Sequence, residues 1–198
     1  MGQQAIDKSQ IDTGSLYQFD GEQGWDDLIG VIASRKTIEA SDPNWVACRG
    51  GVYAYSFSAT AMNEVWLTFH VTHSYAPDTV IYPHIHWTTA GTNTGTVRWG
   101  IEYTVAKGYD QESFPTTTTI YLEQPATGTA YQHNIIEATL GQAIPTTHLE
   151  TDALIMVRVF RDGAHANDTC TDAAFGLMCD LHVQTAAPNT KNRNYPFA

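Results

Sequence analysis

Two histidines separated by one residue, His84 and His86, are the side chains in this sequence with the clearest capacity for chemistry. Side chains at positions i and i+2 of a β-strand point to the same side, so both imidazoles could ligate one metal ion. Such a site needs a third ligand and usually a fourth, which must come from other parts of the chain. The candidates are His70, His73, His182 and Glu102.

The HxH pattern resembles that of the metal-binding cupins, which share a jelly-roll barrel. A cupin carries a glutamate a few residues after its HxH, whereas the nine residues after His86, WTTAGTNTG, contain no acid. A second cupin half-motif with its own histidine is also missing. A metal-dependent, cupin-like enzyme that uses His84, His86 and His182 is therefore one alternative. The other is that these histidines form hydrogen bonds across a sheet or lie at a subunit contact.

The remaining residues with catalytic potential form no familiar arrangement. The sequence has no GxSxG, P-loop or GxGxxG motif, and its three cysteines follow neither a disulfide nor a zinc pattern. We interpret all three as reduced thiols: Cys48, Cys170 and Cys179. We therefore expect no catalytic residue, no bound metal and no cofactor, and we classify the chain as a protein without enzymatic activity.

Several charged residues near the end of the chain are better explained by structure than by catalysis. Arg158 is expected to form a structural ion pair, with Asp180 or Glu102 as the partner. Asp168 and Asp172 could cap a turn or hold Ca²⁺, but no EF-hand spacing supports calcium.

Composition excludes several functional classes. The net charge is −11 and no cluster of Lys and Arg is present, so we expect no binding to nucleic acid. No run approaches 18 apolar residues, and the first 20 residues lack an apolar core, so we expect neither a membrane span nor a signal peptide. The acidity suits a neutral or basic protein partner.

The elements that must position the histidines are strands, because apolar residues alternate with polar ones from residue 52 onward. We predict eight strands: Val52–Ser58, Glu64–His73, Val80–Thr88, Val97–Val105, Thr117–Glu123, Tyr131–Ala138, Ala153–Arg161 and Ala173–Gln184. Few helical segments interrupt them, so the predicted fold is an all-β, antiparallel, eight-stranded jelly-roll sandwich.

Extensions are expected at both ends of this sandwich. We predict an N-terminal arm over residues 1–50, the jelly roll over 51–185 and a C-terminal tail over 186–198. Within the arm, the spacing of Trp25, Leu28, Ile29 and Ile32 predicts a short helix over Trp25–Ile38.

Several stretches, taken in order, resemble a family of tailed-bacteriophage virion structural proteins. They are Trp25-Asp26-Asp27-Leu28, Glu64, His73-Ser74-Tyr75, Pro83-His84-Ile85-His86-Trp87, Val97-Arg98-Trp99-Gly100-Ile101-Glu102-Tyr103, Arg158-Val159-Phe160-Arg161-Asp162, Asp168-Thr169 and Asp180-Leu181-His182. The resemblance covers most of the chain from Trp25 to His182. It implies a small structural protein with a jelly-roll core, made in the host cytoplasm and assembled into the virion.

Together these observations favour a non-enzymatic head decoration, or cement, protein. Such a protein would form a homo-oligomer and bind the major capsid protein or other virion proteins. Aromatic residues in the arms are the expected interface anchors: Trp25, Trp45, Tyr195 and Phe197. One alternative is a component of the tail, baseplate or fibre that contacts host glycans, and another is the cupin-like enzyme.

Overall fold

The computed structural model describes residues 24–32 and 41–186, so the predicted anchors Tyr195 and Phe197 lie outside the described residues. The described strands are β1 (Gly24–Ile29), β2 (Val31–Ile32), β3 (Asn44–Arg49), β4 (Val52–Phe57), β5 (Met62–His70), β6 (Tyr82–Thr89), β7 (Thr96–Ala106), β8 (Thr118–Pro125), β9 (Asn134–Glu137), β10 (Leu154–Asp162) and β11 (Ala174–Thr185). Two 3-10 turns, η2 (Leu140–Gln142) and η3 (Thr146–His148), connect β9 to β10. Within these ranges there is no helix with the length and apolar character needed to cross a lipid bilayer.

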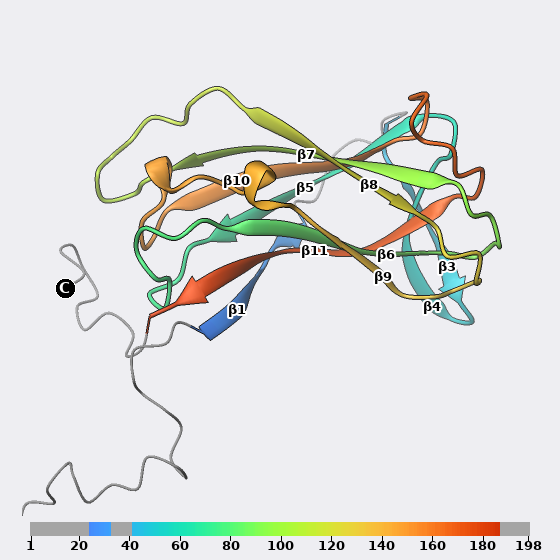
Figure 1. The fold of residues 1–198 in the computed structure, drawn as a ribbon, viewed down its shortest axis with the longest axis horizontal. Coiled ribbons are helices and arrows are strands. Elements are labelled where there is room, and N and C mark those ends of the chain that lie inside the picture. Colours follow the sequence, from blue (N-terminus) through green and yellow to red (C-terminus); the bar gives the residue numbers. More distant parts are fainter. Residues whose placement is uncertain (1–23, 33–40, 187–198) are drawn as a thin grey trace, which may run out of the picture.

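The strands form two antiparallel sheets that pack face to face (Figure 1). One sheet has the order β3-β4-β11-β6-β9, with β1 added beside β11, and the other has the order β2-β5-β10-β7-β8. Strands β4 to β11 correspond one to one with the eight predicted strands. They alternate between the sheets except at β7 and β8, which pair in one sheet, as in a jelly roll. The predicted fold class is therefore confirmed, and β1, β2 and β3 add to the predicted set.

The core lies between the sheets and is centred on aromatic rings. Trp87 and Trp99 are fully buried, with ring centroids 6.4 Å apart, and Phe57 meets Trp99 edge-on at 5.1 Å. The indole nitrogen of Trp87 donates a hydrogen bond to Gln124 Oε1 at 2.8 Å. Because neighbouring residues on a strand point to opposite faces, a tryptophan at position 87 in the core places His86 on the outer face.

The predicted helix over Trp25–Ile38 is wrong where the structure describes it. Residues 24–29 pair antiparallel with β11, and residues 31–32 pair with β5 in the other sheet. The chain crosses between sheets at Gly30, where a Cβ would lie 2.5 Å from the ring of Phe69. The apolar residues at helical spacing therefore belong to strands of two sheets. Pairing with the backbone edges of β11 and β5 outweighs the local preference for a helix. Part of the predicted arm thus lies in the sheets.

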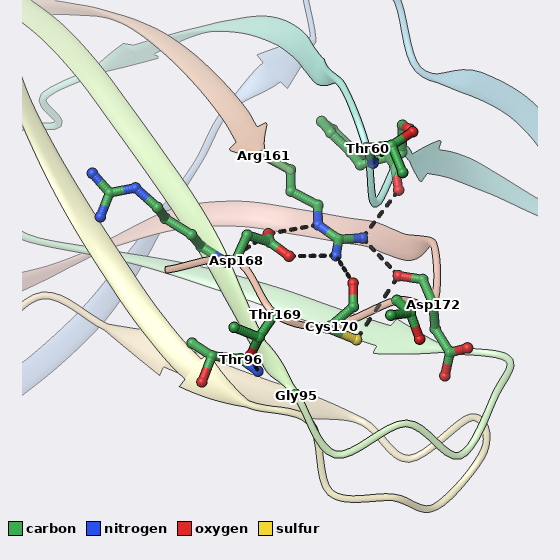
Figure 2. A network of polar contacts seen from close by, with 12 residues as sticks. Thr60, Gly95, Thr96, Arg161, Asp168, Thr169, Cys170 and Asp172 are labelled. Atoms are coloured by element: carbon green, nitrogen blue, oxygen red, sulfur yellow. Dashed lines mark hydrogen bonds and ion pairs between the residues drawn. The ribbon is translucent and has the colours of Figure 1, made fainter. Parts of the chain in front are cut away.

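A fully buried arginine holds the loop between β10 and β11 in place (Figure 2). Arg161 donates two hydrogen bonds to the Asp168 carboxylate, from Nε at 2.9 Å and from Nη2 at 2.8 Å. Its other donors reach the backbone oxygens of Phe57, Cys170 and Asp172. All five N–H groups of the guanidinium are therefore used, which is what makes burial of the charge tolerable.

The predictions for the other charged residues of this region have mixed outcomes. Arg158 pairs with Glu102 at 2.8 Å and with Glu64, so the prediction of a structural ion pair is confirmed for Glu102, and the alternative partner, Asp180, is wrong. Asp172 Oδ2 accepts a hydrogen bond from the backbone N–H of Asn93 at 2.9 Å, which links the loop before β11 to the loop between β6 and β7.

Candidate functional site

The outer face of the sheet that contains β6 and β11 carries a cluster of imidazoles and carboxylates. His84 and His86 come from β6, and the register of the sheet places Asp180 opposite His84. His182 follows on β11, opposite Asp27 of β1, and Glu137 of β9 lies on the other side of His84; we call these six residues the histidine–carboxylate cluster. The intervening residues of β6 and β11 point into the core, so strand alternation directs the polar members outward together.

At the centre of the cluster, two imidazoles converge on one carboxylate oxygen. His84 Nε2 lies 2.6 Å from Asp180 Oδ1, and His86 Nε2 lies 3.4 Å from the same atom. His84 and Asp180 are 2% and 4% exposed, although they point away from the sandwich core. Neighbouring side chains of the cluster therefore cover them.

The hydrogen bonding of this central group is incomplete. Neither His84 Nδ1 nor Asp180 Oδ1 has a hydrogen-bond partner, although both atoms are buried. The short contact between His84 Nε2 and Asp180 Oδ1 is thus a close approach of two polar atoms that lacks the alignment of a hydrogen bond.

His86 has a different role for each of its ring nitrogens. Nδ1 lies 2.8 Å from His133 Nε2, and the two rings stack with centroids 5.0 Å apart. Nε2 faces Asp180. The contact with His133 occupies Nδ1 and fixes the orientation of the ring. Nε2 is therefore available to contact Asp180 or a ligand bound beside it.

The surroundings shift the pKa values of His84 and His86 in opposite directions. Burial is the largest single influence on His84 and lowers its pKa, but the carboxylates of Asp180, Asp27 and Glu137 together outweigh it, so the pKa of His84 is raised. Burial is also the largest influence on His86, and here it prevails over the attraction of Asp180, so the pKa of His86 is lowered. Side chains with shifted pKa values are common at functional sites.

His182 completes the outer part of the cluster. Its ring stacks on that of His84 with centroids 3.9 Å apart. Its Nε2 lies 3.0 Å from Asp27 Oδ1, and its Nδ1 contacts Glu137. Among the described residues, two overlapping groups have ligand atoms close enough to hold one metal ion: Asp27, His84 and His182, and His84, His86 and Asp180.

The other candidate ligands lie elsewhere. His70 and His73 both contact Asp152, at 2.8 and 3.4 Å, and Glu102 belongs to the ion pair of the opposite sheet. Sequence reasoning therefore placed His182 correctly beside His84 and missed the carboxylates of the cluster. The available signal was the DxH pattern on the last strand, Asp180-Leu181-His182, which matches the HxH of β6 once the two strands are paired.

A groove of about 450 Å³ lies beside the cluster. Trp25 and Tyr82 line it with their rings edge to face, 5.8 Å apart, and Glu137, Leu140 and His182 contribute to its wall. The predicted anchor Trp25 is therefore part of a groove that has both aromatic and hydrogen-bonding surface.

The predicted anchor Trp45 lies at the opposite end of the sheet, on the hairpin formed by β3 and β4 (Figure 1). Its ring is 58% exposed, stacks on Tyr53 at 6.3 Å and meets Tyr55 edge-on at 4.8 Å. Val46 and Val52 of the same hairpin are also exposed. Strand alternation places Val46 and Val52 on the opposite face of the hairpin from Trp45 and Tyr53. We call Trp45 and Tyr53 the hairpin patch; the structure does not bring Trp25 to it.

Comparison with known proteins gives a likeness of fold at low similarity. No protein-family model matches the chain, and no curated protein sequence matches it. Among solved structures, it is similar to CBM35 from Cellvibrio japonicus Abf62, with a TM-score of 0.41, 10% identity and coverage of 81% of this chain and 93% of the other. A second similar structure is TmCBM61 in complex with β-1,4-galactotriose, with a TM-score of 0.30, 15% identity and coverage of 67% and 71%. At these scores the likeness carries no conclusion about function.

Proposed function

We propose that this chain is a non-enzymatic structural protein of a phage virion that decorates the head and docks on the major capsid protein through the hairpin patch. The resemblance of its sequence motifs to phage virion proteins supports the class of protein. The exposed aromatic hairpin, the observation that carries the proposal, supports docking on another protein.

The hairpin patch has the properties of an anchor for a protein partner. Trp45 is a large apolar side chain in water, and its contacts with Tyr53 and Tyr55 hold it in one orientation. A side chain that is already ordered loses little conformational entropy on binding, so more of its buried area contributes to affinity. Tryptophan and tyrosine are the residue types most enriched among binding hot spots.

Decoration stabilises a shell by mass action. A protein that binds the assembled capsid lattice, and not free subunits, lowers the free energy of the lattice by an amount that grows with its concentration. The net charge of −11 makes a neutral or basic capsid surface the preferred partner. A homo-oligomer would present several hairpin patches at once and so increase avidity.

Immunogold labelling of intact virions with antibody against this chain tests the location. Label spread over the head is the expected result, whereas label confined to the tail would overturn the decoration role. Binding of purified chain to undecorated heads then tests the patch. Trp45→Ala should weaken binding by at least about 30-fold, as for a hot spot of 2 kcal/mol. Phe114→Ala, which removes an exposed aromatic residue from the loop between β7 and β8, should bind like the parent chain and serves as the matched control.

The groove beside the histidine–carboxylate cluster favours a second candidate function, contact with host glycans by a tail or fibre component. Sugar rings stack on aromatic faces, and their hydroxyls need hydrogen-bonding groups, which Trp25, Tyr82 and Glu137 offer together. Titration with soluble oligosaccharides tests this candidate. Saturable binding that Trp25→Ala abolishes and Trp45→Ala leaves intact, combined with label on the tail, would favour it over decoration.

A further inference from the structure

We propose that the histidine–carboxylate cluster binds one divalent transition-metal ion of the zinc class, with His84 Nε2, His86 Nε2 and Asp180 Oδ1 as the protein ligands. The site lies on the outer sheet face, at the other end of the sheet from the hairpin patch, and does not depend on the proposed virion role. Two imidazoles and one carboxylate are a donor set that zinc accepts, with a fourth position left for water or another side chain.

One ligand–ligand distance matches a tetrahedral ion and a second is shorter, and all three ligand atoms lie within 4.8 Å of one another. Ligand atoms about 2.0–2.1 Å from the metal stand roughly 3.3–3.4 Å from each other in a tetrahedron. His86 Nε2 and Asp180 Oδ1 are separated by 3.4 Å, so this edge is already formed. His84 Nε2 lies 2.6 Å from Asp180 Oδ1, and this edge opens by about 0.7 Å when an ion enters between the two atoms.

The Asp180 carboxylate oxygen is the second indication of a ligand. Asp180 Oδ1 is a buried carboxylate oxygen without a hydrogen-bond partner, and it is the atom on which both imidazoles converge. Buried polar atoms without a partner are rare in native proteins because leaving them unsatisfied costs free energy, and a bound ion is one of the ways to satisfy them. A single cation at this point satisfies the oxygen and both Nε2 atoms together.

His86 has the outer-shell contact that orients ligating histidines in known metal sites, whereas Nδ1 of His84 has no such partner. His133 contacts Nδ1 of His86, the nitrogen that faces away from the metal position, and such a contact orients a ligating ring. His182 stacks on His84 and contacts Asp27 and Glu137. Three carboxylates within one cluster also make the local potential favourable for a divalent ion.

The competing explanation is a buried ion pair in which His84 carries a proton and Asp180 balances it. This explanation accounts for the 2.6 Å contact, but it leaves His86 Nε2 facing the same oxygen at 3.4 Å, too far for a good hydrogen bond. The two explanations differ in one observable property, because the ion pair needs no metal.

Calorimetric titration of the full chain, purified without a histidine tag and stripped with EDTA, tests the proposal with Zn²⁺ as the probe. We expect one ion per chain and a melting temperature that rises by roughly 5–10 °C when free Zn²⁺ is 100 times the Kd. Titration with Co²⁺ should give the visible absorption of a tetrahedral ion with nitrogen and oxygen ligands. Absence of saturable Zn²⁺ binding in the folded chain would overturn the proposal in favour of the ion pair.

Variants identify the ligands. His86→Gln removes a partly exposed ligand, so the fold should survive, and it should weaken Zn²⁺ binding by at least about 100-fold. His133→Gln should weaken binding about 10- to 100-fold, as expected for a positioning residue. His70→Gln, an exposed histidine that contacts Asp152, is the matched control and should bind like the parent chain. Loss of binding in His182→Gln with unchanged binding in His86→Gln would overturn the ligand assignment.

Discussion

Replacing Arg161 by lysine should destabilise the sandwich more than any conservative change on its surface. Lysine keeps the positive charge but offers three donors in place of the five that Arg161 uses, and its ammonium cannot reach both sides of the network. At least two hydrogen bonds to a charged group are lost, each worth about 1.5–3 kcal/mol. We therefore expect the free energy of unfolding to fall by about 3 kcal/mol or more.

Urea unfolding followed by tryptophan fluorescence measures this loss directly. For a chain of this length, 3 kcal/mol corresponds to a fall in melting temperature of about 6–12 °C. Arg158→Lys on the same strand is the matched control, because Arg158 also pairs with two carboxylates but is partly exposed. The control should lose less than about 1 kcal/mol.

The test compares the loss of unfolding free energy in Arg161→Lys with that in Arg158→Lys. If Arg161→Lys costs no more than Arg158→Lys, the buried network does not hold the loop between β10 and β11, and the reasoning is refuted. A change in the slope of the unfolding curve, rather than in its midpoint, would indicate instead that the variant alters the unfolded ensemble.

Three further predictions concern single groups. Hydrogen bonds from Arg158 and then Thr117 lower the pKa of Glu102, so its stabilisation is present above the unfolded pKa of about 4.3 and is lost as the pH falls through the lower folded value. In urea titrations, Glu102→Gln should therefore cost less than about 1 kcal/mol at pH 7, and progressively less as the pH falls below about 4.3. Gly100→Ala should cost about 1–3 kcal/mol in the same assay, because its Cβ would lie 2.1 Å from the Phe160 ring. Burial raises the pKa of all three thiols, and only Cys48 is partly exposed, so Ellman's reagent should titrate at most one thiol in the native chain and three after unfolding; a second reactive native thiol would contradict this.

The jelly roll could be predicted from sequence because its eight strands alternate cleanly between inward and outward residues. Val97–Val105 is the clearest example, and β7 buries Val97, Trp99, Ile101, Tyr103 and Val105 as that alternation requires. The strands before residue 52 could not be predicted in the same way. In β1 only Leu28 is buried, so the sequence of this strand has no period of two, and pairing with β11 determines its conformation.

The candidate site could be predicted only in part, for a related reason. HxH on one strand is visible in the sequence, but its partners come from strands about 50 to 100 residues away. Which outward residues meet depends on the order and register of the strands, and those follow from the whole topology rather than from local periodicity. The sequence therefore leaves Asp180 as one of two alternative partners for Arg158, although Arg158 lies on the other sheet.

The position of β11 has a consequence for synthesis of the chain in the cell. This strand is the last one in sequence among those described, yet it pairs with β1, β4 and β6. A nascent chain that has reached the end of β10 can complete the sheet of β5, β7, β8 and β10. The opposite sheet still lacks β11, the strand that lies between β4 and β6. The sheet that contains β4 and β6 therefore cannot form until β11 has been synthesised, and until then the edges of β4 and β6 are open to pairing with other chains.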